Sequence, residues 1–431
     1  MAVSGYASYR SAMPWAAEPQ DTTLAASRPA QHPQRISAGP GHREEPRHIL
    51  LLCLGGIGDC VLSFPALRDL RRARPDDHIT ALAMWPQSAD LLRDLGIFDE
   101  VLQHNFQQAR WWRSLGAALR LRRRRYDDCI LTFPTNRFEY NALAYLLGAR
   151  RRFGHNYVRG GDIENLRFLL TDRIEQQAGR HVVDENRALV ARFTGTLPNG
   201  QADTRLGPLA PRYHHEATRM LGHLREPLLG IHAGSSSYKG LALKRWPAER
   251  FGELCRRARR QLGLQPVVFG TPEDIELKLQ MQAHCPEVFL AHGETIRHTA
   301  ALIARCAALV SNDSALAHVA SALDVPVVML CGPTDPNEVK PYTSAGRVLN
   351  VELGCSPCFR VGRAPMRCTH VVTQGCMKGI SVAQVLTAVR ECLDIPQVEL
   401  VRHVGLGLHQ SLKTQKGYHL PVLAPAICQG A

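Results

Sequence analysis

Three polar segments that could do chemistry follow short apolar runs in this 431-residue sequence. Asp59 stands directly after a glycine turn, Lys244 follows a loop of small residues, and Ser311–His318 is a cluster of hydroxyl, amide, carboxylate and imidazole side chains. A carboxylate suits proton abstraction, whereas a cation beside loop N–H groups suits an anion such as a phosphate. The residue types predict a base and a phosphate-binding region.

The apolar runs that precede these segments have the length and character of strands buried on both faces of a sheet. Helical patterns separate them: one runs from Asp59 and closes before Pro75, and another starts near Pro247. Alternating strands and helices predict right-handed βαβ units and parallel sheets. Ligands of such sheets bind beyond the carboxyl ends of the strands. The predicted strands are residues 48–54, 79–84, 126–133, 227–232, 266–269, 308–310 and 325–330.

The pattern restarts after a polar, proline-bearing linker at 199–212. We therefore expect two consecutive doubly wound α/β domains, at 47–205 and 220–395. Residues 1–46 carry no apolar periodicity and are expected to be a disordered leader. Residues 396–431 form a C-terminal tail outside both domains.

The formal net charge of +13 points to an anionic partner: nucleic acid, a lipid surface or a phosphorylated substrate. The unbroken run Arg122–Arg125 could bind any of these three anionic partners. It is also compatible with a helix face that is simply exposed to solvent. No apolar run reaches the ~20 residues that span a bilayer, and the N-terminus lacks a secretory signal pattern. We expect a cytoplasmic protein whose 13 cysteines stay reduced.

The glycine turn Gly55–Gly58 does not predict a dinucleotide site. Val61 stands where the third glycine of that fingerprint belongs, and no acidic residue ends the second strand. The turn instead presents Asp59 at a helix N-terminus. Helix capping is the simpler role for this carboxylate, and general-base chemistry is the alternative. A helix N-terminus should lower the pKa of Asp59.

The loops of the second half favour a phosphorylated, hydroxyl-rich ligand. Lys244 lies where it could reach an anion, although a surface lysine without a role is equally compatible. Asp313 can cap the helix that follows it, and His318 has the context of a hydrogen-bonded core histidine. The turn Gly332–Pro336 adds a third polar loop at a strand end. No Gly-x-Ser-x-Gly pattern surrounds the serines, which argues against a serine hydrolase.

Four late cysteines have spacing compatible with a four-thiolate zinc or iron site. Buried thiols without a metal are the alternative. The cluster is expected beside the second domain and not in the cleft, which indicates a structural role. These residues are Cys355, Cys358, Cys368 and Cys376.

Residues from about 48 to 395 resemble family-nine glycosyltransferases, the group of the ADP-heptose:lipopolysaccharide heptosyltransferases. The resemblance implies a GT-B fold, in which two Rossmann-like domains face each other, with the acceptor on the first and the nucleotide-sugar on the second. The motifs that carry it, in the family's order, are Gly58-Asp59-x5-Pro65, Lys244-Arg-Trp-Pro247, Asn312-Asp-Ser-x3-His318 and Gly332-Pro-Thr-Asp-Pro336.

The same resemblance assigns roles to residues. Asp59 matches the proposed base, which takes the acceptor proton in a single displacement that inverts the anomeric carbon. The chain departs from the family at Ala315, where glycine is usual, and in the insertion-like stretch Tyr238–Leu243. The positions that match donor-binding residues are Ser235, Lys244, Asp274, Asp313, Ser314, Leu316 and His318.

The resemblance also implies partners. The donor would be ADP-heptose, no divalent metal is required, and the acceptor would be a phosphorylated, lipid-linked saccharide of the lipopolysaccharide core. The helix around Trp111–Arg125 could rest on anionic headgroups, which makes the expected location the inner face of the inner membrane. Two alternatives remain: a transferase or epimerase for another nucleotide-sugar on the same fold, and a basic nucleic-acid-binding protein.

Overall fold

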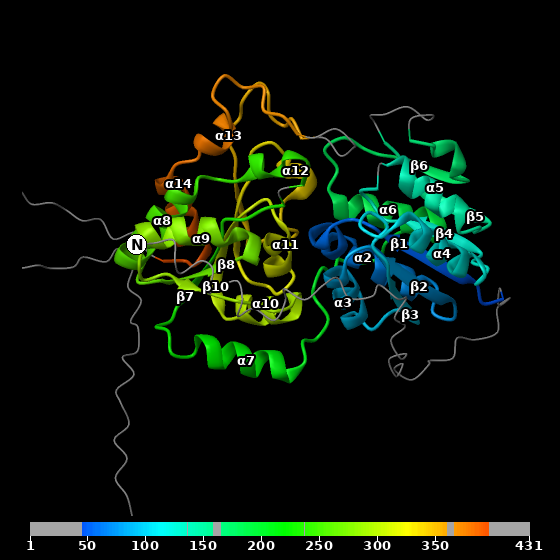
Figure 1. The fold of residues 1–431 in the computed structure, drawn as a ribbon, viewed down its shortest axis with the longest axis horizontal. Helices are drawn as coiled ribbons and strands as arrows, with labels where there is room; N and C mark the ends of the chain where they lie inside the picture. Colours follow the sequence, from blue (N-terminus) through cyan, green and yellow to red (C-terminus); the bar gives the residue numbers. More distant parts are fainter. Residues whose placement is uncertain (1–44, 136, 158–164, 237, 360–365, 396–431) are drawn as a thin grey trace, which may run out of the picture. The chain divides into compact units, whose positions relative to one another are not determined.

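The computed structural model describes residues 45–395, apart from residues 136, 158–164, 237 and 360–365 (Figure 1). Within this part the chain forms two six-stranded sheets in which every strand pair is parallel. The expected tail lies outside the described residues, as does the expected leader except for its last two residues. The α/β prediction with parallel sheets is confirmed.

The first sheet has the strand order β3-β2-β1-β4-β5-β6. Its strands are β1 (His48–Cys53), β2 (His78–Ala83), β3 (Glu100–Gln103), β4 (Asp128–Leu131), β5 (Arg151–Asn156) and β6 (Asp172–Glu175). Its helices are α2 (Ile57–Ala73), α3 (Pro86–Asp94), α4 (Trp111–Arg122), α5 (Phe138–Leu146), the short 3-10 helix η1 (Arg167–Leu169) and α6 (Val182–Thr194).

The second sheet repeats this order as β9-β8-β7-β10-β11-β12. Its strands are β7 (Leu228–His232), β8 (Gln265–Phe269), β9 (Phe289–Leu290), β10 (Cys306–Asn312), β11 (Val327–Leu330) and β12 (Arg347–Leu349). The accompanying helices are α7 (Pro211–Leu221), η2 (Tyr238–Lys244), α8 (Ala248–Arg257), η3 (Ala258–Leu262), η4 (Pro272–Asp274), α9 (Ile275–His284), α10 (Ile296–Ile303), α11 (Ala315–Ser321), α12 (Pro336–Val339), α13 (Gly375–Lys378) and α14 (Val382–Cys392).

The central strand β1 explains why continuous apolar runs became strands. Ile49 and Leu51 pack into the cluster that includes α2, α3 and α6, whereas Leu50 and Leu52 pack into the cluster formed with α4 and α5. Successive side chains of a strand point to opposite faces, so a strand covered on both sides must be apolar throughout. Figure 1 shows helices on both faces of each sheet. Each of the seven runs predicted as strands overlaps an observed strand.

The helix after β1 begins two residues earlier than predicted, at Ile57, with Gly56 at its N-cap. Asp59 is therefore the third helical residue, and its carboxylate accepts a hydrogen bond from the Gly56 N–H at 2.9 Å. The capping role expected of Asp59 is present, but from inside the first turn rather than from the cap position.

The two sheets share one continuous apolar cluster, built from α2, α3 and α6 of the first and α7, α10 and α11 of the second. Helix α2 packs on α11, and the two helices meet where they begin. A Cβ placed on Gly58 would lie 2.8 Å from Cδ2 of His318 and 3.5 Å from Cα of Ala315. Only glycine allows this approach of the two helices.

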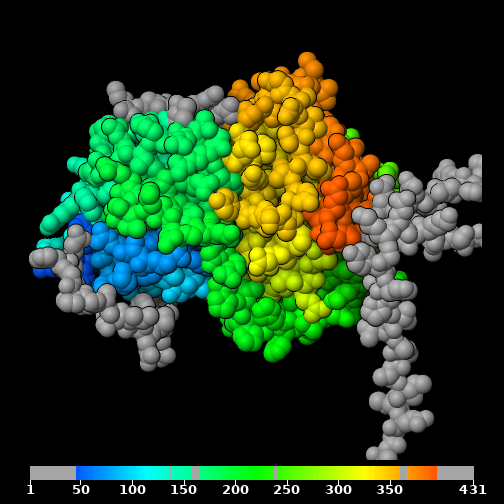
Figure 2. All heavy atoms as spheres, turned by 180° about the vertical axis from the view of Figure 1, so that it is seen from behind, coloured from blue at the N-terminus to red at the C-terminus, as the bar shows by residue number. Residues whose placement is uncertain are grey.

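Polar contacts brace the same junction. The guanidinium of Arg297 on α10 donates to both carboxylate oxygens of Asp94 at 2.6 and 2.9 Å. His181 donates from Nε2 to the Lys340 carbonyl at 2.8 Å, and the Tyr342 hydroxyl donates to Asp184 at 3.0 Å. Figure 2 shows the green segment near residue 180 against the yellow segment near residue 340.

Among the described residues, no helix combines the length and the hydropathy that crossing a bilayer would take.

Replacing Gly58 by alanine should destabilise the protein by about 1–3 kcal/mol, because the added methyl group must displace the buried His318 ring or separate α2 from α11. The urea midpoint of unfolding measures this effect. Gly56→Ala is the matched control on the same turn, since its Cβ would approach only Asp59, at 3.7 Å. Equal midpoints for the two variants would contradict the packing argument.

Candidate active site

Four polar loops of the second sheet follow β7, β8, β10 and β11, at the carboxyl ends of adjacent strands. The strand order reverses between β7 and β10, which is where open α/β sheets leave a crevice. His232 ends β7, and its Nδ1 lies 2.9 Å from the Ser314 hydroxyl and 3.3 Å from that of Ser311. Burial lowers the pKa of His232 to about 4, so the ring is neutral and joins the two loops by hydrogen bonding.

Asn312 fixes the position of three segments at once. Its Oδ1 accepts from the Trp246 backbone N–H at 2.9 Å, and its Nδ2 donates to the Ala233 carbonyl at 2.8 Å. Trp246 is buried and donates from its indole to the Ile380 carbonyl at 3.0 Å. The Asn-Asp-Ser and Lys-Arg-Trp-Pro motifs therefore meet through the asparagine side chain.

Lys244 and Asp313 form the charged centre of these loops. The lysine Nζ lies 2.7 Å from Oδ2 of Asp313, and the Thr334 hydroxyl donates to the same oxygen at 2.6 Å. Burial by itself would raise the pKa of Asp313, but Lys244 and Thr334 outweigh it and hold that pKa below its usual value. The carboxylate stays ionised.

The expected helix cap by Asp313 is wrong. Ser314 occupies the N-cap of α11, and no side chain caps it there. The Asp313 carboxylate turns to Lys244 and Thr334 instead, because a buried carboxylate is stabilised far more by a cation and a hydroxyl than by one backbone N–H.

Asp59 lies close enough to Lys244 and Asp313 to feel both charges. Asp59 is partly buried, and desolvation of its carboxylate raises its pKa to about 6 in spite of the hydrogen bond from Gly56 and the positive charge of Lys244. The expectation of a lowered pKa is therefore wrong: desolvation of the carboxylate exceeds the stabilisation that the helix N-terminus gives it. A Cβ on Gly55 would meet the Asp59 Cβ at 2.7 Å, so the turn also needs glycine there.

His318 on α11 faces Gly58 and is buried. Burial lowers its pKa to about 4, so the ring is neutral. Its Nδ1 has no hydrogen-bond partner among the described residues, unlike the satisfied core histidine that the sequence favoured. Leu316 on the same helix is buried, and the extra methyl group of Ala315 is accommodated because Gly58 lies opposite.

Ser235 and Asp274 lie on the other side of the switch point. The Asp274 Oδ2 accepts from the Thr271 N–H and hydroxyl at 2.9 and 3.0 Å, while Oδ1 lies 3.8 Å from Arg245. Arg245 also donates from Nε to the Ser235 hydroxyl at 3.2 Å. Lys278 donates to the Gly270 carbonyl at 2.9 Å and steadies the turn that carries Asp274.

The insertion-like stretch Tyr238–Leu243 belongs to the short helix η2. Gly240 has a positive φ of 77°, and a Cβ there would meet the Met366 carbonyl oxygen at 2.5 Å. The Gln374 amide donates to the Ala242 carbonyl at 3.3 Å. The added residues therefore dock on the cysteine-bearing segment.

That segment reaches the site, contrary to the expectation that it lies away from it. The Pro333 carbonyl accepts from the backbone N–H groups of Cys358 and Phe359 at 2.9 and 2.7 Å. Lys244 Nζ consequently lies 4.5 Å from the centre of the Phe359 ring. A cation over an aromatic face is favourable, so the ring covers one side of Lys244.

The predicted metal site finds no support in the described residues, where no group of three or more His, Cys, Asp or Glu side chains is placed to hold an ion. The Cys368 sulfur accepts from the Gln374 N–H at 3.3 Å. The Cys376 thiol packs against Gly332, and its pKa is raised chiefly by burial. These two thiols have packing and hydrogen-bonding roles. The expected zinc or iron site at Cys355, Cys358, Cys368 and Cys376 is therefore unsupported in the described residues.

Sequence reasoning missed several side chains that complete the site: His232, Arg245, Phe359 and Tyr157. Tyr157 stacks on Phe133 with ring centroids 5.3 Å apart. Burial, and to a smaller extent the negative charge of Asp59, raises the pKa of Tyr157. Its hydroxyl accepts from the Thr135 N–H at 2.5 Å. His232 and Tyr157 follow or end strands at carboxyl edges, and that position was the available signal.

Residues 112–367 match the family model described as glycosyltransferase family 9 (heptosyltransferase). The chain belongs to glycosyltransferase family 9. It is therefore a glycosyltransferase of the heptosyltransferase-like group. Lipopolysaccharide heptosyltransferase 2 of Salmonella typhimurium is 29% identical to it over 325 residues, which cover 71% of this chain and 88% of the relative.

Solved structures agree on the fold. A family 9 glycosyl transferase from Veillonella parvula superimposes with a TM-score of 0.63 at 24% identity, covering 80% of this chain and 97% of that one. The ADP-heptose LPS heptosyltransferase II of E. coli gives 0.61 at 23% identity, covering 80% and 98%. The family-nine protein thus has the expected GT-B architecture of two Rossmann-like domains.

Removing the cation of the central pair should be costly in the ligand-free protein. Lys244→Met leaves the Asp313 carboxylate buried without its counter-charge, and we expect a loss of about 3 kcal/mol in the free energy of unfolding. Lys244→Met combined with Asp313→Asn should recover much of that loss, because the buried charge is gone. Urea unfolding of both single variants and the double variant measures the coupling. Lys340→Met, at an exposed lysine, is the control. If the loss of unfolding free energy in the double variant equalled the sum of the losses in the two single variants, Lys244 and Asp313 would not be coupled.

Proposed function

We propose that this family-nine glycosyltransferase is an inverting heptosyltransferase, which moves heptose from ADP-heptose to a phosphorylated, lipid-linked saccharide during assembly of the lipopolysaccharide core. The proposal is supported by the family and by the E. coli structure, which is described as an ADP-heptose LPS heptosyltransferase. In it the domain at 47–205 receives the acceptor and the domain at 220–395 binds the donor.

One observation carries the proposal: a partly buried carboxylate of the first domain, Asp59, lies within the electrostatic influence of Lys244 and Asp313 in the proposed donor loops of the second. Asp59 is held by the Gly56 N–H, and one residue away Gly58 touches His318. A helix cap alone needs neither a raised pKa nor a neighbouring Lys–Asp pair. A base that accepts a proton beside a charged leaving group uses both.

The reaction follows as a single displacement. The acceptor hydroxyl oxygen forms a bond to the anomeric carbon while the bond from that carbon to the diphosphate oxygen breaks, and Asp59 takes the hydroxyl proton. Because its pKa is about 6, Asp59 is ionised at neutral pH yet more basic than an ordinary aspartate. The anomeric configuration inverts, and ADP leaves with the electron pair.

The second domain meets the charge of the leaving group. When the donor binds, the Lys244 ammonium would move from Asp313 to the diphosphate, and Thr334 would still donate to the Asp313 carboxylate. Ser235 and the backbone N–H groups of its loop would supply further hydrogen-bond donors to the diphosphate. Oδ2 of Asp274 accepts hydrogen bonds from Thr271, so Oδ1 is the oxygen that would accept from a hydroxyl of the ribose.

Three residues of the loop after β10 complete the proposed donor site. Ser314 is oriented by His232, Leu316 offers apolar surface, and His318 presents a neutral Nδ1 to the donor. The lipid-linked acceptor would place the enzyme on the cytoplasmic face of the inner membrane, as a peripheral protein.

The donor can be identified by the stability it confers. At 100 times its dissociation constant, the true donor should raise the free energy of unfolding by ~2.7 kcal/mol. Thermal unfolding with ADP-heptose and with GDP- and UDP-sugars measures this, and ADP-heptose should give the largest shift at a common concentration. A shift and turnover with another nucleotide-sugar, and none with ADP-heptose, would replace the proposed donor.

Asp59→Asn should reduce kcat by roughly 10²–10⁴-fold, the range for loss of a general base, while the donor dissociation constant changes little. Wild-type kcat/KM should fall as pH drops through about 6, because the base is then protonated. Glu249→Gln, which removes an exposed carboxylate from the first turn of α8, is the control and should leave kcat unchanged. Near-normal turnover of Asp59→Asn would reduce Asp59 to a capping residue.

A further inference from the structure

Helix α4 carries an apolar stripe on its solvent side. Trp111, Leu115 and Leu119 recur every four residues and are 72%, 46% and 49% exposed. A surface helix normally turns such a stripe to the core. Here the core contacts are made by a different set on the same helix, Ala117, Ala118 and Leu121, which are buried. The exposed stripe is therefore additional to what folding requires.

The neighbouring elements extend this stripe into a patch. Tyr145 and Leu146, at the end of α5, are half exposed, and Phe168 on η1 is 60% exposed. The Arg122 guanidinium donates to the Leu146 carbonyl at 3.0 Å, which ties the end of α4 to the end of α5, and η1 packs on α5. We call Trp111, Trp112, Leu115, Leu119, Tyr145, Leu146 and Phe168 the α4–α5 patch.

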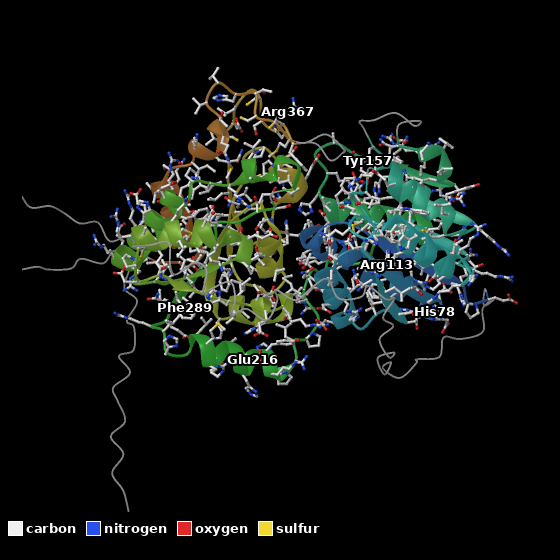
Figure 3. All side chains as sticks on the ribbon, in the orientation of Figure 1. His78, Arg113, Tyr157, Glu216, Phe289 and Arg367 are labelled. Carbon is white, nitrogen blue, oxygen red and sulfur yellow. The ribbon has the colours of Figure 1, made fainter. Side chains whose placement is uncertain are left out.

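Arginines border the patch, and α4 itself contains no acidic residue. Arg110 lies over the Trp112 ring at 5.0 Å, and Arg152 lies over the Tyr145 ring at 5.5 Å. The nearby carboxylates of Glu100 and Glu139 pair with arginines. The exposed arginines of α4 and the residues flanking it are Arg110, Arg113 (labelled in Figure 3), Arg120, Arg122, Arg123, Arg124 and Arg125.

We propose that the α4–α5 patch docks this enzyme on an anionic lipid bilayer, with the aromatic and leucine side chains at the acyl boundary and the arginines among the headgroups. Tryptophan and leucine beside arginine is the composition of interfacial helices. Each basic residue near an anionic surface adds attraction that salt weakens. Membrane docking itself is argued from the patch alone. Only the purpose of the docking, which is to hold the acceptor-binding domain at a lipid-linked substrate, rests on the proposed function.

Other occupants fit the patch less well. A second copy of this chain would bring the two arginine borders together, and like charges across an interface repel. Nucleic acid would engage the arginines and could stack bases on the aromatic rings, but it offers no apolar surface for Leu115 and Leu119. A bilayer with anionic headgroups satisfies both features.

Sedimentation of the full chain with vesicles tests the proposal. We expect binding to vesicles of phosphatidylcholine and phosphatidylglycerol in a 7:3 ratio, and much weaker binding to phosphatidylcholine alone. Leu115→Ser with Leu119→Ser should weaken binding at least tenfold without unfolding the protein, because both side chains are exposed. Arg113→Gln with Arg120→Gln should weaken it and reduce its dependence on salt. The controls, at an exposed leucine on α9 and an exposed arginine on α7, are Leu279→Ser and Arg219→Gln.

The outcomes separate this proposal from the proposed function. The leucine double variant should keep the donor-induced thermal shift and its turnover of a delipidated acceptor, and lose turnover only of an acceptor embedded in vesicles. Equal vesicle binding by wild type and the leucine variant overturns the proposal. So does self-association in solution that the leucine variant abolishes, which would assign the patch to a second copy. Vesicle binding by a chain without transferase activity would support the docking surface while rejecting the function.

Discussion

The close approach of α2 to α11 is the constraint on which the site depends. Gly58 lacks a side chain, so the first turn of α2 can rest on His318, and Asp59 is carried to the loop that follows β10. The surrounding interface is continuous apolar packing braced by Arg297 and His181. A single methyl group at the contact would change the distance between Asp59 and the loop after β10, and glycine is the residue that keeps it short.

The same contact removes water from ionisable groups, and burial then sets their chemistry. The pKa of Asp59 rises to about 6, whereas the pKa values of His232 and His318 fall to about 4. Asp313 keeps its charge because Lys244 and Thr334 hold it. One region thus contains a carboxylate with a raised pKa, a carboxylate that Lys244 and Thr334 keep charged, and two neutral imidazoles.

The local sequence pattern predicted the strands correctly, but it did not predict the contacts and pKa values that depend on tertiary structure. The seven apolar runs became strands because a strand covered on both faces has no alternative composition. The capping role of Asp313 failed because its partners, Lys244 and Thr334, lie 69 and 21 residues away in sequence. The expected lowering of the Asp59 pKa was wrong for a related reason: the local sequence shows the helix N-terminus but not the desolvation of the carboxylate in the folded chain. The cysteine spacing was compatible with a metal, yet spacing leaves the direction of the side chains open.

The sequence by itself determined the parallel α/β class, the order of the polar loops at strand ends and, through four motifs in order, the glycosyltransferase family. These follow from periodicity and turn chemistry, which act over a few residues. Only the tertiary structure decided that Asp59 lies near Lys244 and Asp313, that Phe359 covers Lys244 and that the stripe on α4 has no core to face. Such relations join residues tens to hundreds of positions apart, and they arise from how packed helices approach one another, which no local pattern encodes.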